Sequence, residues 1–143
     1  QGVETLTLRM ERHCANALAI ARHLKHHPKV SWVNFAGLEG DRDYALAQKY
    51  MDGGIPSSLF NFGIKGGREA CARFMDQLQI IKRLVNIGDA KTLACHPATT
   101  THRQLNDEEL KTAGVSADLV RLCIGIEHVD DLIADIDQAL AVA

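Results

Sequence analysis

The sequence lacks the features that would indicate a membrane, nucleic-acid-binding or secreted protein. No apolar run approaches the roughly 20 residues that a membrane-spanning helix requires. The formal net charge is only −2, which gives no sign of a nucleic-acid footprint or of attraction to an anionic membrane. Residues Gln1 to Glu4 contain neither the charged nor the apolar region of a signal peptide. We therefore expect a cytoplasmic protein with no nucleic-acid or membrane partner.

The sequence also lacks any CxxC pair. Its four cysteines are far apart, and most lie in apolar or strand-like stretches, which is typical of reduced, buried thiols. Cys95, His96 and His102 are close in sequence, but their spacing fits no clean zinc motif, so we expect no metal site. The remaining histidines are interpreted as surface or boundary residues: His13, His23, His26, His27 and His128.

What is present suits one globular domain. The chain has 143 residues, of which 46% are hydrophobic and 24% charged, both ordinary for a globular protein. Apolar spacings of three and four residues predict helices, and short apolar runs predict strands. The predicted helices are 3–26, 41–51, 67–85, 106–114 and 129–140, and the predicted strands are 30–35, 57–65, 92–95 and 119–126. This order alone indicates a mixed α and β domain over residues 1–143.

One charged residue interrupts an apolar predicted strand. Arg121 stands in the run VRLCI at 120–124, where a guanidinium is costly unless it meets an anion. Its planar fork suits a carboxylate held by two parallel hydrogen bonds. The strand alone equally allows an ion pair with a core Asp or Glu, or an edge strand with Arg121 facing water.

Two segments of the C-terminal half carry a family resemblance. The first is KTLACHPATTTH at 91–102, and the second is VRLCIGIE at 120–127, followed by DDLI at 130–133. Together they resemble the C-terminal domain of the Cys/Met-metabolism family of pyridoxal-phosphate (PLP) enzymes. That family includes O-acetylhomoserine sulfhydrylases, cystathionine synthases and lyases, and methionine γ-lyase. The resemblance implies an α/β (α+β) fold with a small, mainly antiparallel four-stranded sheet and helices packed on one face.

The resemblance also implies roles for single residues. Arg121 would bind the α-carboxylate of an amino-acid substrate, and the hydroxyl of Thr92 would help to seat it. Lys91 stands where cystathionine-handling members carry a Glu, which favours a sulfhydrylase, although a merely solvated lysine is the alternative. The loop that follows would border the mouth of the active site, with the candidates His96, Thr100 and Thr101.

The resemblance covers nearly the whole chain but only the last third of a typical family member. The lysine that bonds covalently to PLP belongs to a Thr-Lys motif in the family's large domain, and no such motif occurs here. We therefore expect the C-terminal small domain of a longer enzyme, with no catalytic residue of its own and inactive alone. PLP would be bound by the N-terminal domain, and the intact enzyme would be a homotetramer.

The resemblance thus favours an O-acetylhomoserine sulfhydrylase-like enzyme of methionine and cysteine metabolism, in which sulfide or a thiol replaces acetate. Cystathionine γ-synthase and methionine γ-lyase, from the same family, are the nearer alternatives. A non-catalytic module that binds amino acids or dimerises is the alternative of another class. Whether a catalytic domain precedes residue 1 in the native polypeptide would separate these hypotheses.

Overall fold

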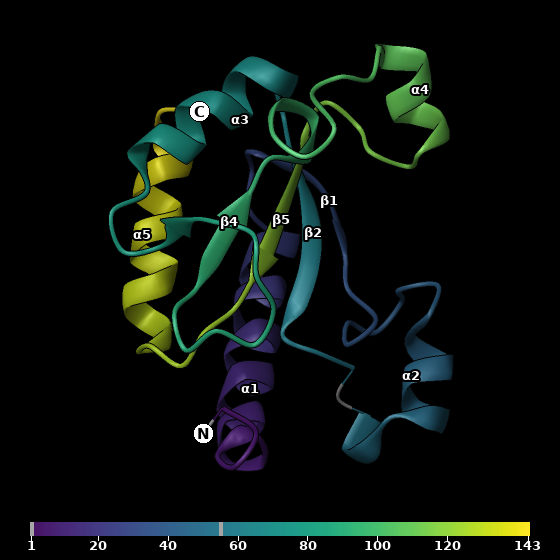
Figure 1. The fold of residues 1–143 in the computed structure, drawn as a ribbon, viewed down its shortest axis with the longest axis vertical. Helices are drawn as coiled ribbons and strands as arrows, with labels where there is room; N and C mark the ends of the chain where they lie inside the picture. Colours follow the sequence, from purple (N-terminus) through teal and green to yellow (C-terminus); the bar gives the residue numbers. More distant parts are fainter. Residues whose placement is uncertain (1, 55) are drawn as a thin grey trace.

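Helices and strands alternate along the chain, as the apolar spacings predict, except that two strands follow one another between residues 82 and 95. The structure is a computed structural model that describes residues 2–54 and 56–143 (Figure 1). The helices are α1 (Leu6–Lys25), α2 (Tyr44–Tyr50), α3 (Gly67–Gln77), α4 (Asp107–Thr112) and α5 (Val129–Ala141). The strands are β1 (Val30–Asn34), β2 (Leu59–Ile64), β3 (Lys82–Arg83), β4 (Leu93–Cys95) and β5 (Leu119–Cys123). Two short 3₁₀ turns, η1 (Asp52–Gly54) and η2 (Pro97–Thr99), complete the elements.

The five strands form one sheet in the order β1-β2-β5-β4-β3. Neighbouring strands are antiparallel, except that β3 and β4 run parallel. β5 is therefore an inner strand, bonded to β2 on one side and to β4 on the other. Its register places Arg121 between Asn61 of β2 and Cys95 of β4. Because directly opposed residues point to the same side of a sheet, these three side chains share one face.

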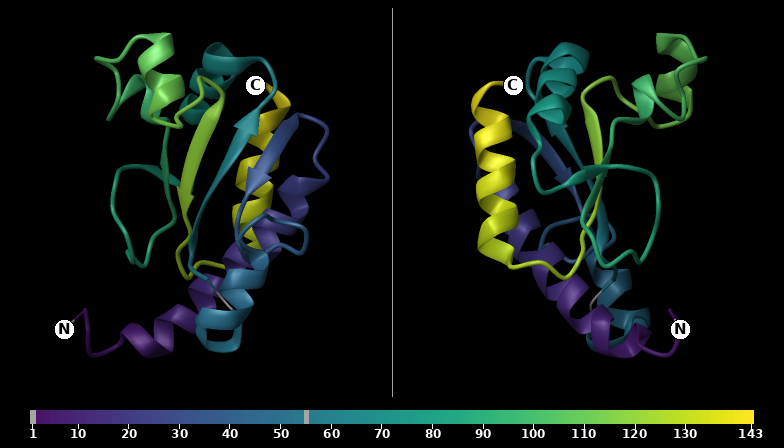
Figure 2. Two further views of the ribbon diagram at one scale, coloured as in Figure 1. Left: turned by 90° about the vertical axis from the view of Figure 1, so that its right-hand side faces the viewer. Right: turned by 60° about the vertical axis from the view of Figure 1, so that its left-hand side comes forward.

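The opposite face of the sheet carries the hydrophobic core. Phe60 and Phe62 of β2 and Val120 and Leu122 of β5 are at most 2% exposed. Helices α1 and α5 both lie on this side of the sheet (Figure 2), and α3 packs against α5. Burying a large apolar side chain contributes about 1.5–3 kcal/mol, so this layer holds the fold together. Its α1 members recur at helical spacing: Ala17, Ile20, Ala21 and Leu24.

All four cysteines are buried, as their apolar surroundings predict. Cys71 of α3 is fully buried, its Sγ lies 3.2 Å from the carbonyl oxygen of Asp118, and burial raises its pKa to about 12. Burial also raises the pKa of Cys14 in α1. Within the described residues, no helix combines the length and the apolar character needed to cross a membrane.

The segment after α3 differs from its prediction. The helix predicted to continue to residue 85 ends at Gln77, Leu78 is extended (φ −60°, ψ 128°), and β3 follows. The cause is Asp135 of α5, which is only 4% exposed and accepts the backbone N–H groups of residues 79, 80 and 81 at 2.9–3.0 Å. Those three N–H groups therefore bond to a buried carboxylate far away in sequence instead of to helical carbonyl oxygens.

The fold class implied by the resemblance is confirmed. The domain is α/β with a mainly antiparallel sheet and its main helices packed on one face. The strand count is corrected from four to five, because residues 82–83, predicted as helix, pair with β4.

Replacing Asp135 by Ala should lower the free energy of unfolding by about 2–4 kcal/mol, because three partly or fully buried N–H groups lose their acceptor. Urea unfolding followed by circular dichroism measures this change. Asp131→Ala, at an exposed position of the same helix, is the matched control and should cost about 1 kcal/mol or less. Equal effects of the two substitutions would contradict the assigned role of Asp135.

Candidate functional site

Arg121 lies at the centre of the sheet face that the main helices leave open. It is half-buried in the inner strand β5, so the edge-strand alternative is wrong. Within the part of the chain that the structure describes, its guanidinium forms no hydrogen bond or ion pair with another side chain. The alternative of an internal ion pair with a core carboxylate therefore has no partner there. An arginine in this state is available to an external anion.

Thr92 is a buried link between two strand ends. It is fully buried, its backbone N–H donates to Oε1 of Glu127 at 2.7 Å, and its hydroxyl donates to Oε2 at 2.8 Å. The same hydroxyl accepts the N–H of Gly125 at 2.8 Å. These bonds tie the segment before β4 to the segment after β5. Direct contact between Thr92 and a carboxylate stays a prediction, but its structural role is clear.

The glycine of this link permits a close approach. A Cβ on Gly125 would lie 2.4 Å from the carbonyl oxygen of Ala90 and 2.4 Å from Oε2 of Glu127, both far inside van der Waals contact. The backbone N–H of Ile126 donates to the same Ala90 oxygen at 2.9 Å. Gly125 and Glu127, which carry much of the family resemblance, thus hold the site together from within the protein.

A stripe of polar side chains on α1 supports the same strand end, and the sequence reading missed it. Asn16, 3% exposed, donates its amide to the carbonyl oxygens of Gly125 at 3.2 Å and Glu127 at 2.9 Å. His13 is fully buried, so its interpretation as a surface residue is wrong. Its Nδ1 lies 2.6 Å from the carbonyl oxygen of Ile124. The signal was a polar residue at 13 and 16 within an otherwise apolar helical face.

The loop after β4 combines a buried histidine with exposed threonines. His96 is 1% exposed, its Nε2–H donates to the carbonyl oxygen of Ala117 at 2.9 Å, and its Nδ1 lies 2.9 Å from the Thr99 hydroxyl. Burial lowers the pKa of His96, so its ring is neutral at pH 7. Thr100 and Thr101 are exposed, and the Thr100 hydroxyl donates to the His96 carbonyl oxygen at 2.8 Å. The histidine shapes the loop, and the two threonines face outward.

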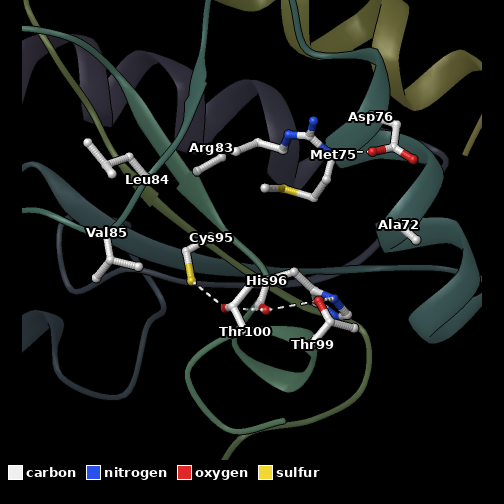
Figure 3. A pocket seen from close by; sticks show the side chains of 11 residues that line it. Ala72, Met75, Asp76, Arg83, Leu84, Val85, Cys95, His96, Thr99 and Thr100 are labelled. Atoms are coloured by element: carbon white, nitrogen blue, oxygen red, sulfur yellow. Dashed lines mark hydrogen bonds and ion pairs between the residues drawn. The ribbon is translucent and has the colours of Figure 1, made fainter.

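A hollow of about 230 Å³ opens beside this loop (Figure 3). Met75 and Asp76 of α3 line one side of the hollow, and Arg83 of β3, which also lines it, forms an ion pair with Asp76. The structure therefore brings two of the predicted site residues, His96 and Thr100, to this hollow, whereas Arg121 and Lys91 are not among its lining. The remaining lining is mostly apolar or small: Ala72, Leu84, Val85, Ala94, Cys95 and Thr99.

Lys91 belongs to an exposed segment between β3 and β4. Its side chain is exposed, and its backbone N–H donates to Oδ1 of Asp89 at 3.0 Å. That backbone N–H, followed by nearby positive charges, holds the pKa of the Asp89 carboxyl below its usual range. Lys91 is therefore fixed by its backbone while its ammonium group remains accessible.

The described lysines do not by themselves make a PLP site. Lys29 is half-buried and donates to the carbonyl oxygen of Ala143 at 2.8 Å. The other lysines whose side chains are described are exposed: Lys25, Lys49, Lys65, Lys82 and Lys91. A lysine that bonds to PLP must reach the cofactor in an enclosed pocket, so the residues present fit the substrate side of a site rather than its cofactor side.

Thr92→Val should lower the free energy of unfolding by about 2–3 kcal/mol, because the N–H of Gly125 and the carboxylate of Glu127 each lose a buried partner. Thr92→Ser keeps the hydroxyl and is the matched variant, with an expected loss of about 1 kcal/mol for one methyl group. Urea midpoints compare the two. A serine variant as unstable as the valine variant would show that packing, not the hydroxyl, matters here.

Stability should fall as the pH drops below about 6.5, the pKa of an unperturbed histidine. The folded-state pKa of His96 is depressed, so the unfolded chain binds the proton first and its population rises. The contribution of His96 to stability is therefore complete above about pH 6.5 and is lost as the pH falls toward the folded-state pKa of His96. His96→Gln keeps a donor for Ala117 without the titration and should flatten the dependence of the free energy of unfolding on pH between about 5 and 7.

Comparison with known proteins identifies relatives over almost the whole chain. The profile of the Cys/Met metabolism PLP-dependent enzymes matches residues 1–141. The chain is 51% identical to an O-acetyl-L-homoserine sulfhydrylase of Leptospira meyeri, over 98% of this chain and 32% of the relative. It is 52% identical to a homocysteine synthase of Schizosaccharomyces pombe, over 100% of this chain and 33% of the relative.

A solved structure agrees with these sequences. A crystal structure from Campylobacter jejuni, named as an O-acetylhomoserine (thiol)-lyase with N'-pyridoxyl-lysine-5'-monophosphate, superimposes with a TM-score of 0.92 at 42% identity. The match covers 99% of this chain and 33% of that one, so the chain spans about a third of the length of the proteins it matches. The resemblance drawn from residues 91–102 and 120–133 is confirmed. The chain belongs to the family of Cys/Met metabolism PLP-dependent enzymes.

Proposed function

We propose that this chain is part of an O-acetylhomoserine sulfhydrylase, in which sulfide or a thiol replaces acetate at Cγ of O-acetylhomoserine. The C–O bond to acetate breaks, a C–S bond forms, and the products are acetate and homocysteine or a thioether. The observation that carries the proposal is that relatives sharing about half of the residues are named as sulfhydrylase and homocysteine synthase. The exposed Lys91, in place of an acidic residue, is consistent with a substrate that has no distal amino group.

The chain would be the C-terminal small domain of that enzyme. Its length, about a third of the relatives, and the exposed or backbone-bonded state of the lysines that the structure describes support this position. PLP, held by the rest of the protein, supplies the electron sink when bound. We further propose a cytoplasmic homotetramer. The intact mass of the endogenous protein tests the domain assignment, because a species near 15.7 kDa would favour a separate, non-catalytic binding module instead.

Within the proposed enzyme, Arg121 would bind the substrate α-carboxylate. Its guanidinium has no protein partner among the described residues, lies on the open face of the sheet, and can offer two parallel donors. Thr92 would act chiefly through Glu127 and Gly125, by keeping the ends of β4 and β5 together. The exposed Thr100 and Thr101, above the buried His96, would border the mouth of the site.

In the intact enzyme, Arg121→Lys should raise KM for O-acetylhomoserine sharply and lower kcat/KM by about 10²-fold, because a point charge replaces a bidentate fork. Steady-state kinetics at saturating sulfide measure this. Arg22→Lys, at an exposed position of α1, is the matched control and should behave as the parent. Normal kinetics of the Arg121 variant would remove this residue from the site.

The same preparation distinguishes the reaction from its family alternatives. Formation of homocysteine from O-acetylhomoserine and sulfide supports the proposal. Cystathionine formation with cysteine as the acceptor would favour a cystathionine γ-synthase. Release of methanethiol from methionine, without sulfide-dependent turnover, would favour a methionine γ-lyase.

A further inference from the structure

The segment between β3 and β4 is held at its middle by a side chain of α1. We refer to residues 84–92 as the β3–β4 loop. Nη1 of Arg9 donates to the carbonyl oxygen of Gly88 at 2.8 Å, a contact between residues 79 positions apart in sequence. The loop end is held separately, by the bond from Ile126 N–H to the Ala90 carbonyl oxygen and by the buried Thr92.

The loop has little else to order its middle. Its side chains at 84–87, 90 and 91 are exposed, so apolar burial does not fix it. The hydrogen bonds of Asn86 and Asp89 stay within the loop: Asn86 accepts the N–H of Ile87 at 2.9 Å, and Asp89 accepts that of Lys91 at 3.0 Å. Outside the loop, the Asp89 carboxylate is attracted by the charge of Arg9 itself. Such hydrogen bonds shape a loop locally but do not fasten it to the rest of the fold. The Arg9 contact is the described bond that does so at its middle.

Arg9 is itself held in a fixed orientation. Its Nη2 donates to the carbonyl oxygen of Gly2 at 2.8 Å, and its Nε donates to the Thr5 hydroxyl at 3.1 Å. Its Nη1 also lies 3.4 Å from Nε2 of His13. Because Nδ1 of His13 faces the Ile124 carbonyl oxygen, that nitrogen carries the proton, and Nε2 presents a lone pair to Arg9. Nη1 of Arg9 thus contacts both Gly88 of the loop and His13, and His13 in turn bonds to the end of β5.

The end of the loop is close to Arg121 in strand register, because Cys95 of β4 stands opposite Arg121 and the loop ends three residues before Cys95. Figure 2 shows the chain between β3 and β4 extending away from α5, with the N-terminal end of α1 passing below the sheet toward it. Arg121 points away from the core, because its strand neighbours Val120 and Leu122 point into it. The position of the loop therefore determines where Lys91 stands relative to the guanidinium.

We propose that Arg9 is a positioning residue, which holds the β3–β4 loop through Gly88 so that the loop forms a wall of the amino-acid subsite at Arg121. This inference rests on the proposed function and deepens it. Arg9 would not touch the substrate. It would act by removing loop conformations in which the subsite is too wide, so its loss should weaken the binding of the amino-acid substrate more than it slows turnover.

The test uses the intact enzyme with four variants of α1. Arg9→Met keeps the stem and removes every donor, so KM for O-acetylhomoserine should rise about tenfold while kcat stays within about twofold and KM for sulfide is unchanged. Arg9→Lys, which can reach Gly88 with one donor, should recover part of the loss. His13→Asn keeps a donor for Ile124 but not the acceptor for Arg9, and should give a smaller change in the same direction. Arg12→Met, at an exposed position one turn along, is the matched control and should have no effect.

Amide hydrogen exchange of the intact protein gives an independent readout. Exchange of the amides at 86–91 should accelerate in Arg9→Met and not in Arg12→Met. An unchanged KM for O-acetylhomoserine, equal changes of both KM values and kcat, or unchanged exchange in the loop would each overturn the positioning role. If the parent enzyme itself turns over no O-acetylhomoserine with sulfide, the proposed function fails and this inference fails with it. Normal parent activity with a silent Arg9 variant rejects this inference alone.

Discussion

The hydrogen bonds of the Glu127 carboxylate are the interaction that keeps the start of β4 and the segment after β5 together. The carboxylate accepts both the backbone N–H and the hydroxyl of Thr92, so it replaces a strand pair where β4 and β5 no longer run side by side. A half-buried carboxylate with two donors is held in this position only while both donors remain in place. The requirement for Gly125 follows from this, since no side chain fits between the carboxylate and the Ala90 carbonyl oxygen. The C-terminal end of the β3–β4 loop, with Lys91, and the end of β5 take their positions from the same link.

Helix α1 combines two tasks on one surface. Its apolar residues Ala17, Ile20 and Leu24 pack into the core, while Asn16 and His13, nearer the N-terminus, bind backbone carbonyl oxygens at the end of β5. Apolar contacts tolerate small shifts of a helix along its axis, but hydrogen bonds of 2.6–3.2 Å do not. The polar stripe therefore sets the register of α1 against the sheet, and the apolar stripe supplies most of the stabilisation.

The elements with strong local periodicity could be predicted, and those that depend on distant contacts could not. Residues 3–26 and 129–140 carry apolar spacings that agree with α1 and α5 to within a few residues. Residues 78–85 carry a similar spacing but are not helical, because Asp135 withdraws their N–H groups from the helix. For the site, the sequence singled out Arg121 from its apolar surroundings, but only the structure showed that it lies on an inner strand and that no described carboxylate pairs with it. The burial of His13 could not be predicted from the sequence, because it depends on a hydrogen bond to the carbonyl oxygen of Ile124, which lies far away in the chain.

The burial of all four cysteines has a chemical consequence for a protein proposed to handle sulfide and thiols. A thiol exchanges with a disulfide or a persulfide only as an accessible thiolate. Cys71, with its pKa raised to about 12, remains protonated, and Cys14, Cys95 and Cys123 are each at most 6% exposed. None of the four cysteines of this chain therefore presents a ready thiol nucleophile to compete for sulfur with the substrate. The four cysteine side chains pack in the interior as apolar groups, and their burial keeps them from reacting with the sulfide or thiol that such an enzyme would process.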